Sequence, residues 1–234
     1  MLSKIKPFLR TNHITKKAYL FLGSIKNYKK ELENKKKRDA LQKNGVALIH
    51  LIQQMLSREF FYFDMGTLLG IIREGRILGH DLDIDVAVHT SGQEQVFILR
   101  ALLKEKGCKL LKSYSISEIG IVEDSFLIND IKFDVSYYFE KGDKDVTYLM
   151  YKDPDNPPVE GCLNVVELSC SPIKELTKIE FNGMLINVPQ NSEKYLAERY
   201  GEKWRIPDKG YVYWKGPSAR PTQLLAYRED FDQE

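Results

Sequence analysis

Apolar residues recur at helical spacing in three parts of the chain. Residues 41–56 repeat apolar positions every three or four residues, which predicts a helix. Residues 93–106 have the same spacing, and Gly107 stands where a helix usually ends in the left-handed conformation. A third helix is predicted to begin at Asn191 or Ser192 and to run to Tyr200, because those residues are good caps.

Strands are predicted where apolar and polar residues alternate with a period of two. The clearest case is 179–188, where Asn182-Gly183 between alternating residues is typical of a hairpin. Gly66-Thr67 is predicted to form a turn, followed by a short helix over 68–72. The segment 204–227 contains three prolines, which predicts irregular packed structure. The other predicted strands are 60–63, 84–88, 118–122, 126–128 and 131–139, the last two joined at Asn129-Asp130.

This order of helices and strands predicts an α+β domain around a mixed sheet. The chain has 234 residues and 43% hydrophobic content, enough for one sizeable core. No apolar run approaches the roughly 20 residues that cross a bilayer, so neither a membrane-spanning helix nor a secretory signal is expected. The three cysteines are odd in number and lack Cys-x-x-Cys spacing, which favours a reducing, cytoplasmic location over disulfides or zinc.

Charge divides the chain into two parts. Residues 1–38 carry 12 Lys or Arg and two Glu, whereas residues 39–234 carry 23 Lys or Arg and 31 Asp or Glu. A basic, amphipathic helical arm is therefore predicted over 1–38, before a catalytic domain over 39–234. Apolar residues such as Ile5, Phe8 and Ile25 lie among the lysines, which fits peripheral contact with a membrane surface better than nucleic-acid binding. A solvated helix whose lysines maintain solubility is the equally weighted alternative.

Three aspartates, Asp81, Asp83 and Asp85, alternate within GHDLDIDVAV at 79–88. Side chains two residues apart in a strand share a face, so Asp83 and Asp85 are expected to point the same way, and Asp81 can join them. Asp134 is on the polar face of the predicted strand 131–139. If the two strands are neighbours, Asp134 converges on the same point.

Converging carboxylates repel one another unless they take up protons or bind a cation. Mg²⁺, or Mn²⁺, suits oxygen ligands and completes its coordination shell with waters and phosphate oxygens. An EF-hand loop that starts at Asp81 is excluded, because its sixth and twelfth positions would be Val86 and Gly92. Aspartates that only cap solvated turns are the simpler alternative for a lone Asp-x-Asp pair.

A phosphate site is predicted between these aspartates and the preceding turn. Gly66 and Thr67 would present backbone N–H groups and a hydroxyl to phosphate oxygens. Arg73 is expected to neutralise phosphate charge, whereas Arg76 is expected to be a surface side chain.

The stretch from 64 to 88 reads DMGTLLGIIREGRILGHDLDIDVAV. It resembles the signature of the LicD-like phosphotransferase family, which includes the fukutin-related proteins. Two later segments also resemble family motifs: IKFDV at 131–135, with Asp134, and IEFNGMLINVPQNSEKYLAERYGEKWRIP at 179–207. The resemblance covers about residues 41–207.

The resemblance implies a nucleotidyltransferase-like fold and a magnesium-dependent enzyme. Such an enzyme moves phosphocholine or a phospho-alditol from a CDP-linked donor to a hydroxyl of a glycan or lipid-linked glycan, and it releases CMP. Asp83 and Asp85 would hold the metal with support from Asp81. Asp134 would be a further ligand or the base, and Arg73 would stabilise the departing CMP. Tyr200 and Trp204 would shape the nucleotide pocket, unless they are ordinary core aromatics.

Two other functions stay open from the residues. One is a nucleotidyltransferase that moves NMP from an NTP to a sugar or small molecule and releases pyrophosphate. The other is a membrane-associated scaffold of a polysaccharide assembly complex, against which the retained acidic cluster argues.

Overall fold

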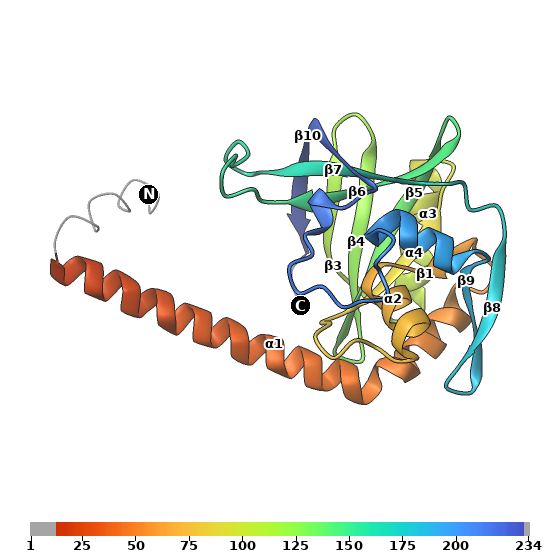
Figure 1. The fold of residues 1–234 in the computed structure, drawn as a ribbon, viewed down its shortest axis with the longest axis horizontal. Helices are drawn as coiled ribbons and strands as arrows, with labels where there is room; N and C mark the ends of the chain where they lie inside the picture. The colour runs from red at the N-terminus through yellow and green to blue at the C-terminus, as the bar shows by residue number, and fades with distance from the viewer. Residues whose placement is uncertain (1–12, 232–234) are drawn as a thin grey trace.

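The computed structural model describes residues 13–231. A single helix, α1 (His13–Met55), carries the chain across the predicted boundary at residue 38 and into the body of the molecule. Figure 1 shows its first part extending away from that body. Most of the described side chains from 23 to 40 are exposed, and burial begins at Leu41 and recurs at Gly45, Leu48 and Ile49. The first 12 residues of the predicted arm lie outside the described part of the chain, so the domain division stays a prediction.

The sheet is mixed, as predicted. Strand β2 (Ile84–His89) runs parallel to β5 (Ile131–Lys141), whereas the other neighbours in the sheet are antiparallel. The strand order is β1-β2-β5-β4-β3-β10-β7-β6. The remaining strands are β1 (Phe61–Phe63), β3 (Lys109–Ile116), β4 (Gly120–Ile128), β6 (Lys144–Tyr151), β7 (Cys162–Cys170) and β10 (Ala219–Asp230).

Six of these strands close into a ring. The end of β5 also pairs with β6, through Phe139↔Val146 to Lys141↔Lys144. The ring therefore runs β5-β4-β3-β10-β7-β6 and back to β5. Strand β5 is shared, because residues 133–138 pair with β2 and residues 139–141 pair with β6. Closure removes exposed strand edges from this part of the sheet.

Helices cover the two faces of the β2–β5 region. The buried end of α1 and helix α3 (Gln93–Glu105) pack on one face, against residues such as Val86 and Phe133. Helices α2 (Met65–Glu74) and α4 (Ser192–Tyr200) pack on the other face, against Ala87 and Tyr138. Alternation along β2 and β5 therefore places Asp85 and Asp134 on the face that α2 and α4 cover.

Local turn signals are confirmed where they were strongest. Asn129 and Asp130 have φ values of 50° and 61° between β4 and β5. Asn182 and Gly183 have φ values of 50° and 86° between β8 (Leu176–Phe181) and β9 (Met184–Pro189). Both pairs fit the left-handed positions of a type I′ hairpin turn. The predicted helices 93–106 and 191–200 are confirmed as α3 and α4.

Three predictions of local structure were wrong. The strands predicted at 118–122 and 126–128 form one strand, β4, from Gly120 to Ile128. Gly66-Thr67 is not a turn after β1, because α2 begins at Met65 and includes both residues. The segment 204–227 is not irregular throughout, because β10 begins at Ala219 and pairs with β3 and β7. A register shift between Pro221 and Leu225 accommodates the proline, which has no N–H for the ladder.

Candidate active site

Two neighbouring strands bring the predicted aspartates together. Asp85 on β2 stands opposite Asp134 on β5 in the parallel register. Asp83 immediately precedes β2, and its Oδ2 lies 2.5 Å from the Lys132 Nζ. The same ammonium lies 2.7 Å from Oδ2 of Asp134. Asp83 and Asp134 therefore share one positive charge, which confirms that carboxylates from the two segments meet.

Neighbouring strands supply polar groups that the sequence reasoning did not assign. Ser125 on β4 donates a hydrogen bond to the Asp134 Oδ1 at 2.5 Å. Lys132 stands on the face of β5 that also carries Asp134, so the alternation places it correctly, but only the structure shows what it contacts. Glu123 on β4 was missed because the predicted strand stopped at 122, whereas β4 continues to Ile128.

Burial disfavours the ionised form of these carboxyl groups and so raises their pKa values. Burial raises the pKa of Asp85 well above its usual value, and the nearby Asp83 and Asp134 raise it further. Burial followed by Asp134 raises the pKa of Asp83, while Lys132 opposes that shift. Burial and then Asp83 raise the pKa of Asp81 to about 7, against the effect of Arg73. A bound cation would favour the ionised form of each group.

The fit of this site to Mg²⁺ rests on its oxygen donors. In residues 13–231, no three Asp, Glu, His or Cys side chains form a ready-made metal cluster. Two carboxylates nevertheless hold one cationic group between them, and the buried Oδ2 of Asp81 has no hydrogen-bond partner. Mg²⁺ needs only one or two protein carboxylates, because water and phosphate oxygens complete its octahedron. The residues present therefore fit a hard divalent cation.

The start of α2 lies against the acidic segment. A Cβ added to Gly66 would lie 3.1 Å from the Asp81 Oδ2, so a side chain at this position would crowd that carboxylate. Thr67 is fully buried, and its hydroxyl accepts a hydrogen bond from the Asp85 N–H at 2.9 Å. Thr67 thus fixes α2 to β2, and its predicted phosphate contact stays a prediction.

Arg73 is held in a mostly buried position beside Asp81. It donates to the Trp204 carbonyl at 3.3 Å and to the Glu74 Oε1 at 2.9 Å, while its buried Nε has no hydrogen-bond partner. Its side chain is 10% exposed, compared with 61% for Arg76. Trp204 is 5% exposed and packs in the core between α2 and α4.

A cavity of about 620 Å³ lies beside the aspartates. Asp85, Glu123 and Asp134 form its acidic part, and Tyr200 also lines it, whereas Trp204 is absent from its lining among the described residues. Burial and then Asp134 raise the pKa of Glu123 to about 8. The rest of the lining is largely aromatic and apolar, with two basic groups: Met65, Tyr114, Ser136, Leu149, Met150, Tyr151, Lys152, Gly161, Cys162, Leu163, Tyr213 and Arg228.

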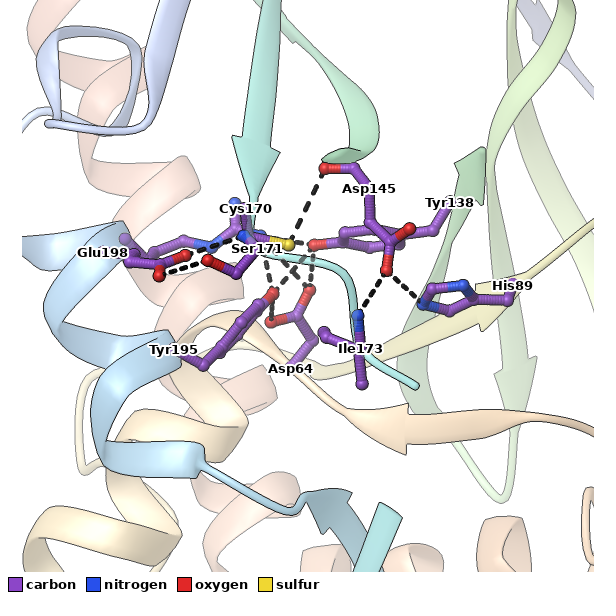
Figure 2. Close-up of polar contacts among 10 residues, drawn as sticks. Asp64, His89, Tyr138, Asp145, Cys170, Ser171, Ile173, Tyr195 and Glu198 are labelled. Carbon is purple, nitrogen blue, oxygen red and sulfur yellow. Dashed lines mark hydrogen bonds and ion pairs between the residues drawn. The ribbon is translucent and has the colours of Figure 1, made fainter. Parts of the chain in front are cut away.

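A buried polar network fixes α4 to the residue that precedes α2 (Figure 2). Asp64 accepts hydrogen bonds from the hydroxyls of Tyr138 and Tyr195, each at 2.6 Å. Arg199 donates to both hydroxyls and lies 3.8 Å from the Asp64 Oδ2. The Asp64 N–H also donates to the Asp85 carbonyl at 3.1 Å. The network therefore supports the backbone of the strand that carries the acidic site.

A second pair of contacts borders this network. Asp145 accepts a hydrogen bond from the Ile173 N–H at 2.7 Å and lies 3.5 Å from the His89 Nε2. Glu198 accepts hydrogen bonds from the Ser171 N–H and hydroxyl at 2.8 and 2.7 Å, as Figure 2 shows. Glu198 thus holds the loop after β7 against α4, and Asp145 holds the same loop against β6.

The family model described as LicD/FKTN/FKRP, nucleotidyltransferase domain, matches residues 59–191. This match spans more than half of the chain and includes the acidic segment and Asp134. The chain belongs to the LicD/FKTN/FKRP nucleotidyltransferase domain family.

Curated relatives agree with this assignment. The chain is 25% identical over 185 residues to human ribitol-5-phosphate transferase FKTN, and 26% identical over 176 residues to the mouse protein of that name. These matches cover 76% and 72% of this chain but only 37% and 34% of the relatives, so the chain spans about a third of their length.

A solved structure overlaps more loosely. The crystal structure of ANT(2″)-Ia in complex with adenylyl-2″-tobramycin covers 72% of this chain and 82% of its own chain, at 15% identity and a TM-score of 0.41.

Proposed function

We propose that this chain is a Mg²⁺-dependent phosphotransferase. It moves a phospho-alditol or phosphocholine group from a CDP-linked donor to a hydroxyl of a cell-surface glycan or of its lipid-linked precursor, and releases CMP. The observation that carries the proposal is the shared cationic position between Asp83 and Asp134, beside a cavity that Asp85 and Asp134 line. Family membership and relatives named as ribitol-5-phosphate transferases support the reaction class.

The side chains of the site divide into holding and positioning roles. Asp83, Asp85 and Asp134 would hold the cation, with Asp81 in support. Mg²⁺ held there would neutralise the diphosphate charge of the donor, which is the main requirement of phosphoryl transfer. Arg73 would favour the negative charge that develops on CMP, and its partly satisfied guanidinium beside Asp81 supports this role.

The cavity has room and chemistry for an organic substrate. Its volume of about 620 Å³ falls within the ordinary range for small-molecule sites. The aromatic rings of Tyr114, Tyr151 and Tyr213 suit the face of a base or sugar ring, and Lys152 and Arg228 suit a phosphate. Either Asp134, where it is not a metal ligand, or Glu123 would accept the proton of the acceptor hydroxyl; the position of both in the cavity lining supports this role.

The exposed part of α1 supports the proposed contact with the cytoplasmic membrane surface, where lipid-linked precursors are held. Ile25, Tyr28 and Leu32 are exposed and spaced by three and four residues, so they share one face of the helix. Exposed Lys29 and Lys30 lie among them. Within the described helices, none is long and apolar enough to cross a bilayer.

The proposed function is tested with a panel of donors. The full chain is incubated with CDP-ribitol, CDP-glycerol or CDP-choline and a cell-envelope glycan, with Mg²⁺ or with a chelator. One donor is expected to yield CMP in the presence of Mg²⁺ only. If no CDP-linked compound yields CMP, the proposal is wrong, and release of pyrophosphate from an NTP would establish a nucleotidyltransferase instead.

A further inference from the structure

Lys132 places a partly buried ammonium at the point where the acidic segments meet. Its Nζ lies 2.5 Å from the Asp83 Oδ2 and 2.7 Å from the Asp134 Oδ2. Its side chain is 20% exposed, so both contacts are partly shielded from water. Charge-assisted contacts of this length are strong compared with ordinary hydrogen bonds.

Lys132 is the positive charge that opposes Asp83 and Asp134 where their carboxylates meet. Without this ammonium, Asp83 and Asp134 would be two partly buried carboxylates with no opposing charge between them. Removing one partner of a buried ion pair is strongly destabilising because it leaves an uncompensated charge.

We propose that Lys132 is an internal counter-cation, which occupies the divalent-cation position of the metal-free protein and is displaced when the ion binds. Its contacts are with the two oxygens that the incoming ion needs, so lysine and ion compete for them. Lysine suits this exchange because its ammonium is a compact charge on a flexible stem. The inference rests on the proposed function only in requiring that a divalent ion binds at this site.

Metal affinity tests the competition directly. Mn²⁺ binding to the full chain is measured by titration calorimetry and by electron paramagnetic resonance, without donor or acceptor. Lys132→Met removes the charge with little change in length, and it is expected to bind Mn²⁺ at least about tenfold more tightly than the wild type. Lys132→Arg keeps a positive charge and is expected to bind no more tightly than the wild type.

Lys112→Met is the matched control for loss of a nearby positive charge. Lys112 affects the pKa of Asp83 through its charge, but its Nζ donates to the Tyr114 hydroxyl at 3.1 Å. This variant is expected to change Mn²⁺ affinity by less than about threefold, because no carboxylate contact is released. Equal tightening in the two Met variants would overturn the proposal, since simple loss of charge would then explain both.

Thermal unfolding gives a second readout that does not depend on turnover. Lys132→Met is expected to melt at a lower temperature than the wild type in chelator, and to recover most of that difference in Mn²⁺. A variant that stays unfolded in both conditions would overturn the proposal, since the role of Lys132 would then be independent of the ion.

The outcomes also separate this inference from the proposed function. If the wild type binds Mn²⁺ and Lys132→Met binds it with unchanged or weaker affinity, the counter-cation role fails while the transferase proposal stands. If the wild type binds no divalent ion, the counter-cation role and the metal dependence of the transferase both fail. If the wild type binds Mn²⁺ but no CDP-linked donor is used, the proposed reaction fails while the counter-cation role is still decided by the variants.

Discussion

Asp85 and Asp134 stand directly opposite each other on the parallel strands β2 and β5. Like charges in neighbouring positions of a sheet are unfavourable, and burial increases the penalty. Lys132 offsets this repulsion for Asp134 but forms neither an ion pair nor a hydrogen bond with Asp85. An arrangement that is unfavourable for the isolated fold is expected where a bound cation makes it useful.

Asp85→Asn should remove activity without harming the fold. We expect CMP release to fall by at least about 100-fold, because the amide has no negative charge for the cation or the developing transition state. The melting temperature in chelator should be unchanged or higher, since the substitution removes a buried carboxyl group whose ionisation is already unfavourable. Turnover at the wild-type rate would remove Asp85 from the site.

Asp64→Ala should destabilise the protein far more than a change at the neighbouring Glu198. Loss of the Asp64 carboxylate leaves Arg199 with no nearby acid and two buried tyrosine hydroxyls without their acceptor. We expect the free energy of unfolding to fall by about 3–5 kcal/mol in urea titrations. The control Glu198→Gln, at a partly exposed pair with Ser171, should cost about 1 kcal/mol. Equal losses would contradict the assigned importance of the Asp64 network.

The stability of the metal-free protein should fall as the pH rises from about 4 to about 8. The pKa of Asp81 is raised to about 7 and that of Glu123 to about 8, so both bind protons more tightly in the folded chain than in the unfolded one. The stability that this difference contributes is complete below the ordinary carboxyl pKa of about 4 and is lost as the pH passes the folded values. Melting temperatures measured in chelator across this range check the direction.

Glu123→Gln should flatten the upper part of that pH profile, because the amide does not titrate. Glu118 is exposed and lies outside the cavity lining, so the control Glu118→Gln should leave the profile unchanged. Added Mg²⁺ should reduce the fall, since the ion favours the ionised carboxylates. A metal-free profile that rises from pH 4 to 8 would show that these groups are not buried as the structure has them.

The triple variant Ile25→Ser, Tyr28→Ser and Leu32→Ser should bind membranes more weakly than the wild type. Replacing Ile25, Tyr28 and Leu32 together removes the exposed apolar face of α1 while leaving its lysines in place. We expect co-sedimentation with vesicles rich in phosphatidylglycerol to fall about tenfold or more. The control Asn27→Ser with Asn34→Ser changes side chains off that face. Vesicle binding that is the same in both proteins would exclude this face as the membrane contact.

The parts of the fold that could be predicted from the sequence depend on interactions within a short stretch of the chain. Asn129-Asp130 and Asn182-Gly183 adopt left-handed backbone conformations whatever they pack against, so their hairpins could be recognised locally. Alternation likewise placed Asp134 on the polar face of the strand that is now β5. The predicted convergence of Asp134 with Asp83 and Asp85 required only that β2 and β5 be neighbours, and the parallel pairing of these strands confirms that they are.

The parts that were missed depend on distant residues. Gly66 looked like a turn residue, but it is a helical glycine that makes room for the carboxylate of Asp81, 15 positions later. Strand β10 was hidden by Pro221 and by partners in β3 and β7 that are far away in the chain. The contacts of Lys132 with Asp83 and Asp134 could not be predicted either, since strand alternation sets the face of a side chain but not its partner.

The account depends on carboxylates from two strands holding a cation against the phosphates of a donor. Phosphorus NMR of the full chain with a glycan acceptor and each of CDP-ribitol, CDP-glycerol and CDP-choline tests it most directly, and one donor is expected to react. The account predicts CMP and a new phosphodiester signal with Mg²⁺, and neither signal in chelator or with Asp134→Asn. The same two signals at undiminished rate in chelator, or with Asp134→Asn, would contradict it.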